Sequence, residues 1–216
     1  MTRRTRWTVA ILAVVVALTV ALVAQLRDAG APGAPTRVTG AVADREHRDA
    51  DTPAALAGPR ERAGLEPCPL TGPGGGPGPE SLRGVTVDCA ADGSVVDVGR
   101  ALAGRRVVLN FWASWCAPCA AELTALADYQ RRVGSQVTVL TVHQDENETA
   151  ALLRLAELGV RLPTLQDGRR RVAAALRVPN VMPATVVVRP DGTVATTLVR
   201  AFASADEIAA AVGNAA

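Results

Sequence analysis

The sequence predicts an α/β domain, in which helices alternate with the strands of one sheet, preceded by a single transmembrane helix. Three observations support this fold class. From residue 84 onward, segments with strand patterning alternate with segments whose apolar residues recur at helical spacing. Two cysteines, Cys116 and Cys119, stand where one such strand passes into a helix. Near the N-terminus, an uncharged apolar run covers residues 7–26.

The first 26 residues have the pattern of a signal anchor. Arginines 3, 4 and 6 precede an apolar run that is long enough to span the hydrocarbon core of a bilayer. Because basic residues stay on the cytoplasmic side, we expect residues 1–6 to be cytoplasmic and the rest of the chain to be exported. A cleaved signal peptide, with a late cleavage site at Ala29-Gly30-Ala31, is the alternative. We predict a single-pass protein of the cell membrane whose remaining domain is extracytoplasmic.

Composition divides the rest of the chain into a linker and a domain. Residues 27–67 are rich in Ala, Gly, Pro, Arg and Asp and keep no apolar period, so we predict a flexible linker there and a folded domain at 68–216. A short helix over 46–57 is the alternative for part of this linker. The net charge is only +2, and no basic patch with interleaved aromatic residues occurs, which argues against a nucleic-acid partner. We expect the domain to be a monomer.

A β-hairpin is predicted over residues 84–98. Valines and a cysteine alternate with polar residues before an Asp92-Gly93 turn, and three further valines follow it. The segment over residues 102–106 then leads into the next strand.

Cys68 and Cys89 bracket a proline- and glycine-rich loop and the first half of this hairpin. An even number of cysteines in an exported protein favours pairing, so these two remain for each other once Cys116 and Cys119 are paired. We predict a structural Cys68–Cys89 disulfide. A second redox pair that relays electrons to Cys116 is the alternative.

The chemistry is expected at the Cys-x-x-Cys motif between an apolar strand, Val107–Phe111, and an amphipathic helix over 120–132. This spacing places the Cys116 sulfur at the tip of the helix, where unpaired amides and the helix dipole favour a thiolate. The Cys119 sulfur lies one turn later and can resolve a mixed disulfide. Half of a zinc site and a plain structural disulfide are the alternatives, but the chain offers no second tight pair of ligands. We predict a redox-active Cys116–Cys119 disulfide that needs no metal and no organic cofactor.

The remaining elements follow from periodicity and capping. We predict strands over 136–142, 160–165, 184–188 and 193–200, and helices over 147–158, 169–176 and from the Ser204 cap onward. His143 follows a strand without a set of ligands around it in the sequence, so we expect an ordinary histidine in the loop at that strand end.

The segment Asn110-Phe111-Trp112-Ala113-Ser114-Trp115-Cys116-Ala117-Pro118-Cys119 resembles the active-site segment of thioredoxin-like proteins, in particular the membrane-anchored TlpA/ResA-like branch. The resemblance runs from about Gly84 to the C-terminus. It implies a thioredoxin-like fold with an N-terminal β-hairpin extension and a central helix-strand insertion. It also implies that Pro183 is a cis proline facing the sulfurs, and that a client protein docks on Trp112, Trp115, Met182 and Pro183.

A functional glutamate is also implied at Glu122, in the pattern Cys-x-x-Cys-x-x-Glu, as a carboxylate that moves protons near the sulfurs. Two residues depart from the family pattern. Asn110 stands where thioredoxin carries a buried aspartate, and an amide cannot accept a proton at neutral pH. Thr124 stands where relatives carry a proline that kinks the helix.

By this resemblance the chain is a thiol–disulfide oxidoreductase, and we predict a reductase of disulfide-containing client proteins that is itself re-reduced by a membrane thiol-relay donor. Relatives in the branch reduce proteins of cytochrome c maturation or of oxidase assembly. A disulfide-donating oxidase for exported proteins and a non-catalytic binding module are the alternative functions.

Overall fold

The computed structural model describes residues 51–71 and 78–213. The predicted cytoplasmic N-terminus (1–6), the transmembrane run (7–26) and most of the predicted linker lie outside the described residues. Within 51–71 and 78–213, no helix is both long and apolar enough to cross a membrane.

Seven strands and six α-helices are formed by the described residues, together with two short 3-10 helices, η1 (Glu80–Leu82) and η2 (Gly134–Gln136). The strands are β1 (Thr86–Cys89), β2 (Val95–Asp97), β3 (Val107–Trp112), β4 (Thr138–His143), β5 (Thr164–Gln166), β6 (Ala184–Val188) and β7 (Val194–Leu198). The helices are α3 (Pro53–Ala63), α4 (Val98–Leu102), α5 (Ala117–Val133), α6 (Glu148–Leu158), α7 (Arg171–Ala175) and α8 (Ala205–Gly213).

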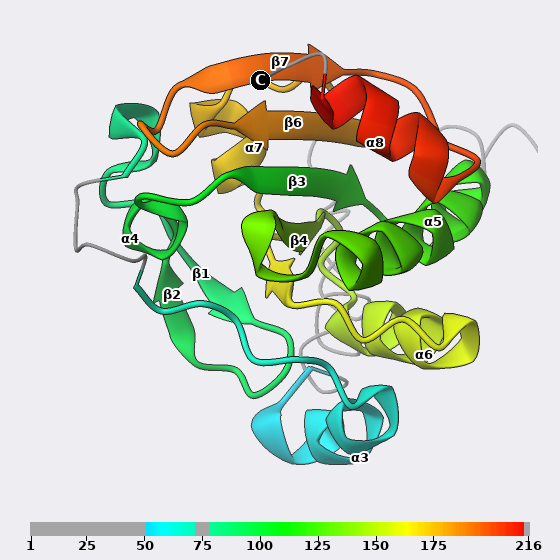
Figure 1. The fold of residues 1–216 in the computed structure, drawn as a ribbon. Helices are drawn as coiled ribbons and strands as arrows, with labels where there is room; N and C mark the ends of the chain where they lie inside the picture. The colour runs from blue at the N-terminus through cyan, green and yellow to red at the C-terminus, as the bar shows by residue number, and fades with distance from the viewer. Residues whose placement is uncertain (1–50, 72–77, 214–216) are drawn as a thin grey trace, which may run out of the picture. The chain divides into compact units, whose positions relative to one another are not determined.

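All seven strands join one sheet in the order β2-β1-β5-β4-β3-β6-β7 (Figure 1). The central strands β3, β4 and β5 are parallel, and the remaining neighbours are antiparallel. This arrangement confirms the predicted α/β class. The N-terminal hairpin is confirmed as well, since β1 pairs with β2 and the pair extends the sheet beyond β5.

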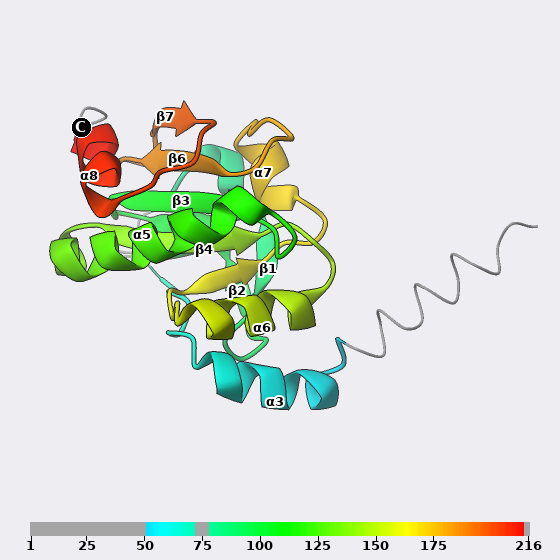
Figure 2. The ribbon, with the colours of Figure 1, turned by 90° about the vertical axis from the view of Figure 1, so that its right-hand side faces the viewer.

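Two apolar layers cover the sheet, one on each face. Along β3, Val107, Leu109 and Phe111 pack with residues of α4 and α7, whereas Val108 and Trp112 pack with residues of α5, α6 and α8. Figures 1 and 2 show these helices on the two faces of the sheet. A strand that is covered on both faces needs apolar residues at consecutive positions, which is why β3 is recognisable as a continuous apolar run.

Helix α3 corrects the prediction of a flexible linker through residue 67. Thr52 caps it by accepting a hydrogen bond from the Ala55 amide at 3.3 Å, and Gly64 ends it in the left-handed conformation. Leu56 and Ala63 are buried against Leu152 of α6. Figure 2 shows α3 lying along α6. The sequence pattern was weak because this helix buries only a narrow side.

Three smaller elements differ from the prediction. Strand β5 is shorter than the predicted 160–165, because it pairs with its neighbours only over Thr164–Gln166 and follows a proline, which has no amide to donate. Helix α7 begins later than residue 169, since Arg170 is left-handed with φ of 55°. Helix α4 was not predicted; the side chain of Asp97 caps it by accepting a hydrogen bond from the Arg100 amide.

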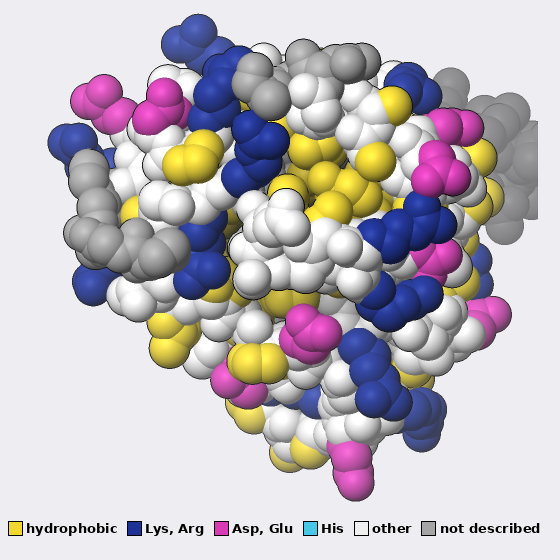
Figure 3. Space-filling model, viewed as in Figure 1, with side chains coloured by type: hydrophobic (Ala, Val, Ile, Leu, Met, Phe, Trp, Pro, Cys, Tyr) yellow, Lys and Arg dark blue, Asp and Glu magenta, His cyan; other side chains and the backbone are white. Residues whose placement is uncertain are grey.

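On the face of the molecule shown in Figure 3, arginine side chains are interspersed with acidic ones, and apolar side chains are exposed between them. This mixed surface agrees with the small net charge of the whole chain.

Candidate redox-active site

The candidate site is formed by the turn between β3 and α5. Cys116 is the N-cap residue of α5, Pro118 occupies its first turn, and Cys119 lies one turn into the helix. Two backbone hydrogen bonds close this turn, from the Cys116 amide to the Ala113 carbonyl at 3.0 Å and from the Cys119 amide to the Cys116 carbonyl at 3.2 Å. The sequence therefore placed the motif correctly at the junction of strand and helix.

Cys116 and Cys119 form a disulfide, with their Cα atoms 5.4 Å apart. Cys116 is 6% exposed and Cys119 is 1% exposed. Both cysteines are buried, and Cys116 at the N-cap is the slightly more exposed residue of the two. When the pair is reduced, the amides and the dipole of a seventeen-residue helix favour the thiolate form of Cys116.

Glu122 is fully buried one turn after Cys119 on the same side of α5. Its Oε1 accepts a hydrogen bond from the Thr185 hydroxyl at 3.3 Å. Burial raises the pKa of Glu122 from 4.5 to about 7, although contacts with Asn110, Thr185, the Phe202 backbone and Arg200 act in the opposite direction. A carboxyl group with this pKa can hold or release a proton near neutral pH.

Asn110 and Thr185 connect this carboxyl group to the sheet. They face each other in the register of β3 and β6, and the Asn110 side-chain amide donates to the Thr185 hydroxyl at 3.2 Å. Among the residues that the structure describes, Glu122 Oε2 and Asn110 Oδ1 are buried acceptors without a hydrogen-bond partner. Thr185 was missed in the sequence; the β3–β6 register that brings it to Asn110 joins positions 75 residues apart.

The two tryptophans of the motif have different surroundings. Trp115 is 66% exposed, and its indole Nε1 donates to Asp145 Oδ2 at 3.1 Å. Trp112 is fully buried, and its indole Nε1 donates to the Thr141 hydroxyl at 3.2 Å. The prediction that Trp112 frames a docking surface is therefore wrong, because its side chain packs inside the layer between the sheet and α5.

Met182 and Pro183 reach the same end of the sheet from β6. The peptide bond between them is cis, as the family resemblance implied. Ala184, the next residue, pairs with Phe111 near the end of β3. Met182 is half-buried and packs against the apolar cluster that contains Cys116 and Cys119. Met182 and Pro183 therefore lie at the end of the sheet where β3 passes into the turn that carries Cys116 and Cys119.

His143 was expected in a loop, but it is the last residue of β4 and is fully buried. Its Nε2 accepts a hydrogen bond from the Ser114 amide at 3.3 Å. The strand pattern of 137–142 gave no indication of this contact, because Ser114 lies 29 residues earlier in the chain.

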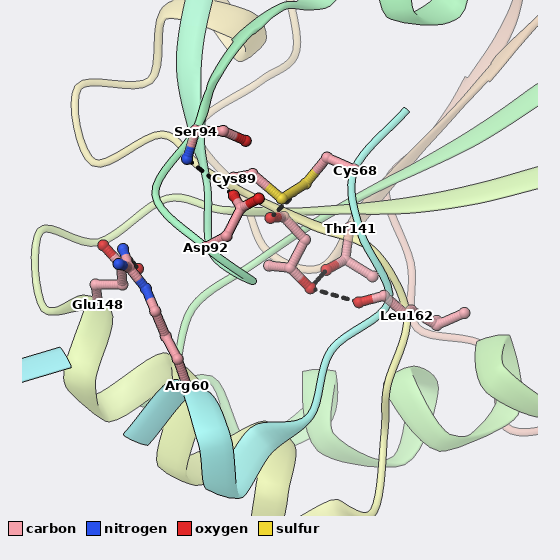
Figure 4. The surroundings of a disulfide bond; sticks show 9 residues. Arg60, Cys68, Cys89, Asp92, Ser94, Thr141, Glu148 and Leu162 are labelled. Atoms are coloured by element: carbon pink, nitrogen blue, oxygen red, sulfur yellow. Dashed lines mark hydrogen bonds and ion pairs between the residues drawn. A yellow bond between two sulfur atoms is a disulfide. The ribbon is translucent and has the colours of Figure 1, made fainter. Parts of the chain in front are cut away.

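The second disulfide joins Cys68 to Cys89, with their Cα atoms 5.9 Å apart, and confirms the predicted pairing. Figure 4 shows its surroundings, which include the Arg60–Glu148 ion pair and the turn stabilised by Asp92 and Ser94. Both cysteines are buried. Cys89 is on β1, separated from β3 by β5 and β4. Three strand spacings separate β1 from β3 by about 14 Å, and this separation favours a structural disulfide over a relay of electrons to Cys116.

Within the described part of the chain, no group of three or more His, Cys, Asp or Glu side chains is placed to hold a metal ion. Independently of this, the first turns of α5 bring together two cysteines and a buried carboxyl group.

Comparisons with known proteins agree with this geometry. A family model described as Redoxin matches residues 76–212. Thiol-disulfide oxidoreductase ResA of Bacillus subtilis is 34% identical over 94 residues, which are 43% of this chain and 52% of that protein. ResA of Oceanobacillus iheyensis is 32% identical over 92 residues, which are 42% of this chain and 47% of that protein. The chain thus spans about half the length of the curated relatives it matches.

Among solved structures, a secreted disulfide oxidoreductase of Mycobacterium tuberculosis, described as homologous to Escherichia coli DsbE, is 28% identical with a TM-score of 0.54. The alignment covers 62% of this chain and 98% of that structure. The M. tuberculosis DsbF structure shares the fold, with a TM-score of 0.56, 24% identity and coverage of 64% of this chain and 99% of that one.

Proposed function

The chain belongs to the Redoxin family, and on that premise we propose that it is a ResA-like thiol–disulfide oxidoreductase whose Cys116–Cys119 pair exchanges with disulfides of client proteins. One observation carries the proposal: the pair closes a disulfide at the N-terminus of α5, with Cys116 at the N-cap more exposed than Cys119 inside the first turn. Thiol–disulfide exchange needs this asymmetry between an attacking and a resolving thiol.

In the proposed reducing direction, the Cys116 thiolate attacks one sulfur of a client disulfide. The client S–S bond breaks, its second sulfur leaves as a thiolate and takes a proton, and a mixed disulfide forms. Cys119 then loses its proton and attacks the Cys116 sulfur. This step releases the second client thiolate and leaves the Cys116–Cys119 disulfide, so two electrons have passed to the client.

Glu122 is proposed as the group that accepts the proton of Cys119 in the second step. Its burial raises its pKa to about 7, which suits a group that must be ionised to accept a proton and neutral to return it. The side-chain amide of Asn110 cannot accept a proton at neutral pH, so Glu122 is the group available for this step beside the resolving cysteine.

Trp115, Met182 and Pro183 are proposed as the surface on which a client docks. Trp115 is the exposed aromatic residue directly before Cys116, and Met182 packs against the cluster that holds both sulfurs. A flat apolar ring and a flexible thioether adapt to clients of different sequence.

An extracytoplasmic location on the cell membrane is part of the proposal. The apolar run at 7–26, with its preceding arginines, supports a signal anchor. Two disulfides in a small domain support an oxidising compartment. A membrane thiol-relay donor would then re-reduce the Cys116–Cys119 pair, and proteins of cytochrome c maturation or oxidase assembly are the clients to test first.

The test combines three variants of the full chain. Cys119→Ser should trap clients as mixed disulfides that dithiothreitol releases, because Cys116 can attack but cannot be resolved. Cys116→Ser should trap none and should abolish reduction of insulin disulfides. Cys68→Ser with Cys89→Ser is the matched control, since it removes two cysteines outside the site and should leave insulin reduction intact.

The redox potential of Cys116–Cys119 then distinguishes the direction of exchange. A potential of about −230 mV or lower supports a reductase, whereas a value near about −120 mV identifies a disulfide-donating oxidase. If Cys119→Ser traps no client and Cys116→Ser reduces insulin as well as the native chain, the domain is a binding module and the proposal is wrong.

A further inference from the structure

His143 ends β4 directly beside the active-site turn. In the parallel register of β3 and β4 it lies opposite Trp112, the residue from which the turn begins. The centres of the two rings are 4.9 Å apart at an angle of 57°. The side chain of His143 is fully buried. A buried imidazole needs partners for both of its ring nitrogens, and these partners identify its protonation state.

The hydrogen bonds around His143 are consistent with a single tautomer. The Gln166 side-chain amide donates to the Asp145 carbonyl at 2.7 Å, which leaves Gln166 Oε1 as an acceptor. His143 Nδ1 lies 2.9 Å from that oxygen and must therefore carry the proton. Nε2 is then unprotonated, and it accepts the hydrogen bond from the Ser114 amide. The imidazole is neutral, with Nδ1 as donor and Nε2 as acceptor.

We propose that neutral His143 is a positioning residue for Cys116, because it holds the backbone of the turn that carries the reactive sulfur. Ser114 is two residues before Cys116, and its amide has its partner on a rigid central strand. Gln144, the residue after His143, holds the start of the same turn, because its amide donates to the Trp112 carbonyl at 2.9 Å. The inference rests on the proposed function, in that the positioned group is the attacking cysteine.

The charges around His143 leave it neutral at physiological pH. Burial has the largest effect on the pKa of His143 and lowers it. The hydrogen bond with Gln166 and the charges of Asp145 and Asp51 raise this pKa, but by less than burial lowers it. The side chains from the other adjoining segments, Trp112 and Ser114, do not titrate near neutral pH. If Nε2 gained a proton in acid, it would become a donor that faces the Ser114 N–H, and the contact that holds the turn would be lost.

The first experiment tests the tautomer in the native chain. We would label the full chain with ¹⁵N-histidine and record the two ring nitrogens of His143 in the oxidised and the reduced protein, with a His143→Gln variant to assign the signals. A protonated Nδ1 and an unprotonated Nε2 at neutral pH are expected. A protonated Nε2 would overturn the inference, and the tautomer itself is measured on the native chain.

The second experiment compares His143→Phe with His143→Gln. Phenylalanine keeps a ring against Trp112 but has no acceptor, whereas glutamine places an amide oxygen near the former position of Nε2. In the reduced chain, alkylation of Cys116 by iodoacetamide near pH 7 should be about fivefold slower in His143→Phe and within about twofold of the native rate in His143→Gln. The reason is that a loosened turn aligns the sulfur less well with the helix amides.

Equal loss in both variants, or no loss in either, would overturn the positioning role. A merely structural residue would not be rescued by glutamine, which fits the ring site worse than phenylalanine does. Neither experiment involves a client protein. If the tautomer and the alkylation rates are as expected but the native chain reduces no client disulfide, the proposed function fails and the positioning role of His143 stands.

Discussion

The Thr185 hydroxyl donates a hydrogen bond to Glu122 Oε1 at 3.3 Å, and neither side chain is exposed to solvent. A neutral donor of this kind stabilises the carboxylate less than water does, so burial dominates and the pKa of Glu122 is raised. The consequence is a group whose charge changes near neutral pH inside the layer that holds the sulfurs.

The first prediction concerns the pH dependence of stability. The folded-state pKa of Glu122, about 7, lies above its unfolded value of 4.5, so the folded form holds the proton more tightly. The resulting stabilisation of the folded form is fully present below about pH 4.5 and is lost as the pH rises through about 7. At about 1.4 kcal/mol per pKa unit, it amounts to about 3 kcal/mol in the free energy of unfolding. Glu122→Gln should remove this part of the pH dependence in urea unfolding of the oxidised chain.

The matched control is Glu157→Gln, which changes an exposed glutamate on α6 whose partner is Arg154. Its pH profile should follow that of the native chain. If Glu122→Gln leaves the profile unchanged, the carboxyl group of Glu122 does not titrate in the range stated.

The second prediction concerns the Cys68–Cys89 disulfide. It closes a loop between cysteines 21 residues apart, so replacing both cysteines by serine should lower the free energy of unfolding by about 3 kcal/mol in the loop-entropy account. Urea unfolding under oxidising conditions measures this change. Insulin reduction should persist at a temperature where the variant stays folded, whereas its loss there would mean that this pair relays electrons.

The third prediction concerns the attachment of α3. Arg60 donates to Glu148 Oε1 at 2.9 Å, and both side chains are mostly buried. Arg60→Met should destabilise the chain by about 3 kcal/mol, because it leaves the buried Glu148 carboxylate without its partner. Limited proteolysis should then cleave within 51–66 sooner than in the native chain.

Arg154→Met provides the comparison for this change, since Arg154 pairs with the exposed Glu157 three residues away. Such a surface pair contributes about 0.5 kcal/mol or less. Equal effects of the two substitutions would show that the Arg60–Glu148 pair is not what fastens α3.

The fourth prediction separates the two tryptophans. Trp112→Ala should lower the free energy of unfolding by about 3–5 kcal/mol, as expected for removal of a buried aromatic side chain. Trp115→Ala should change stability by about 0.5 kcal/mol or less, because the side chain is 66% exposed. Its effect should be seen in the KM for a client disulfide rather than in unfolding. An unchanged KM would remove Trp115 from the docking surface.

The elements that the sequence predicted well are those whose pattern is local. Five of the six residues of β3 are apolar or aromatic, with only Asn110 between them, and this run identifies the strand. Asn147 and Ser204 mark helix starts by their capping side chains. The site cysteines belong to this group, since their spacing and their place before a helix are both visible in a ten-residue window.

The features that were missed or wrong depend on contacts between distant positions. Helix α3 is fixed by a partner 88 residues later, and His143 acquires its role from an amide 29 residues earlier. The same limit explains Trp112 and Trp115, which look alike in the sequence although one is buried under α5 and the other is exposed. Which of the two faces inward depends on tertiary contacts that form only in the folded chain.

The hairpin formed by β1 and β2 also has a consequence for self-association. Without it, β5 would end the sheet and offer its free amide and carbonyl groups to any other chain. With it, the sheet ends on that side in β2, which has three residues and carries Asp97 at its end. An edge this short is a poor template for intermolecular strand pairing. The same hairpin that holds Cys89 therefore protects the folded domain against edge-to-edge aggregation.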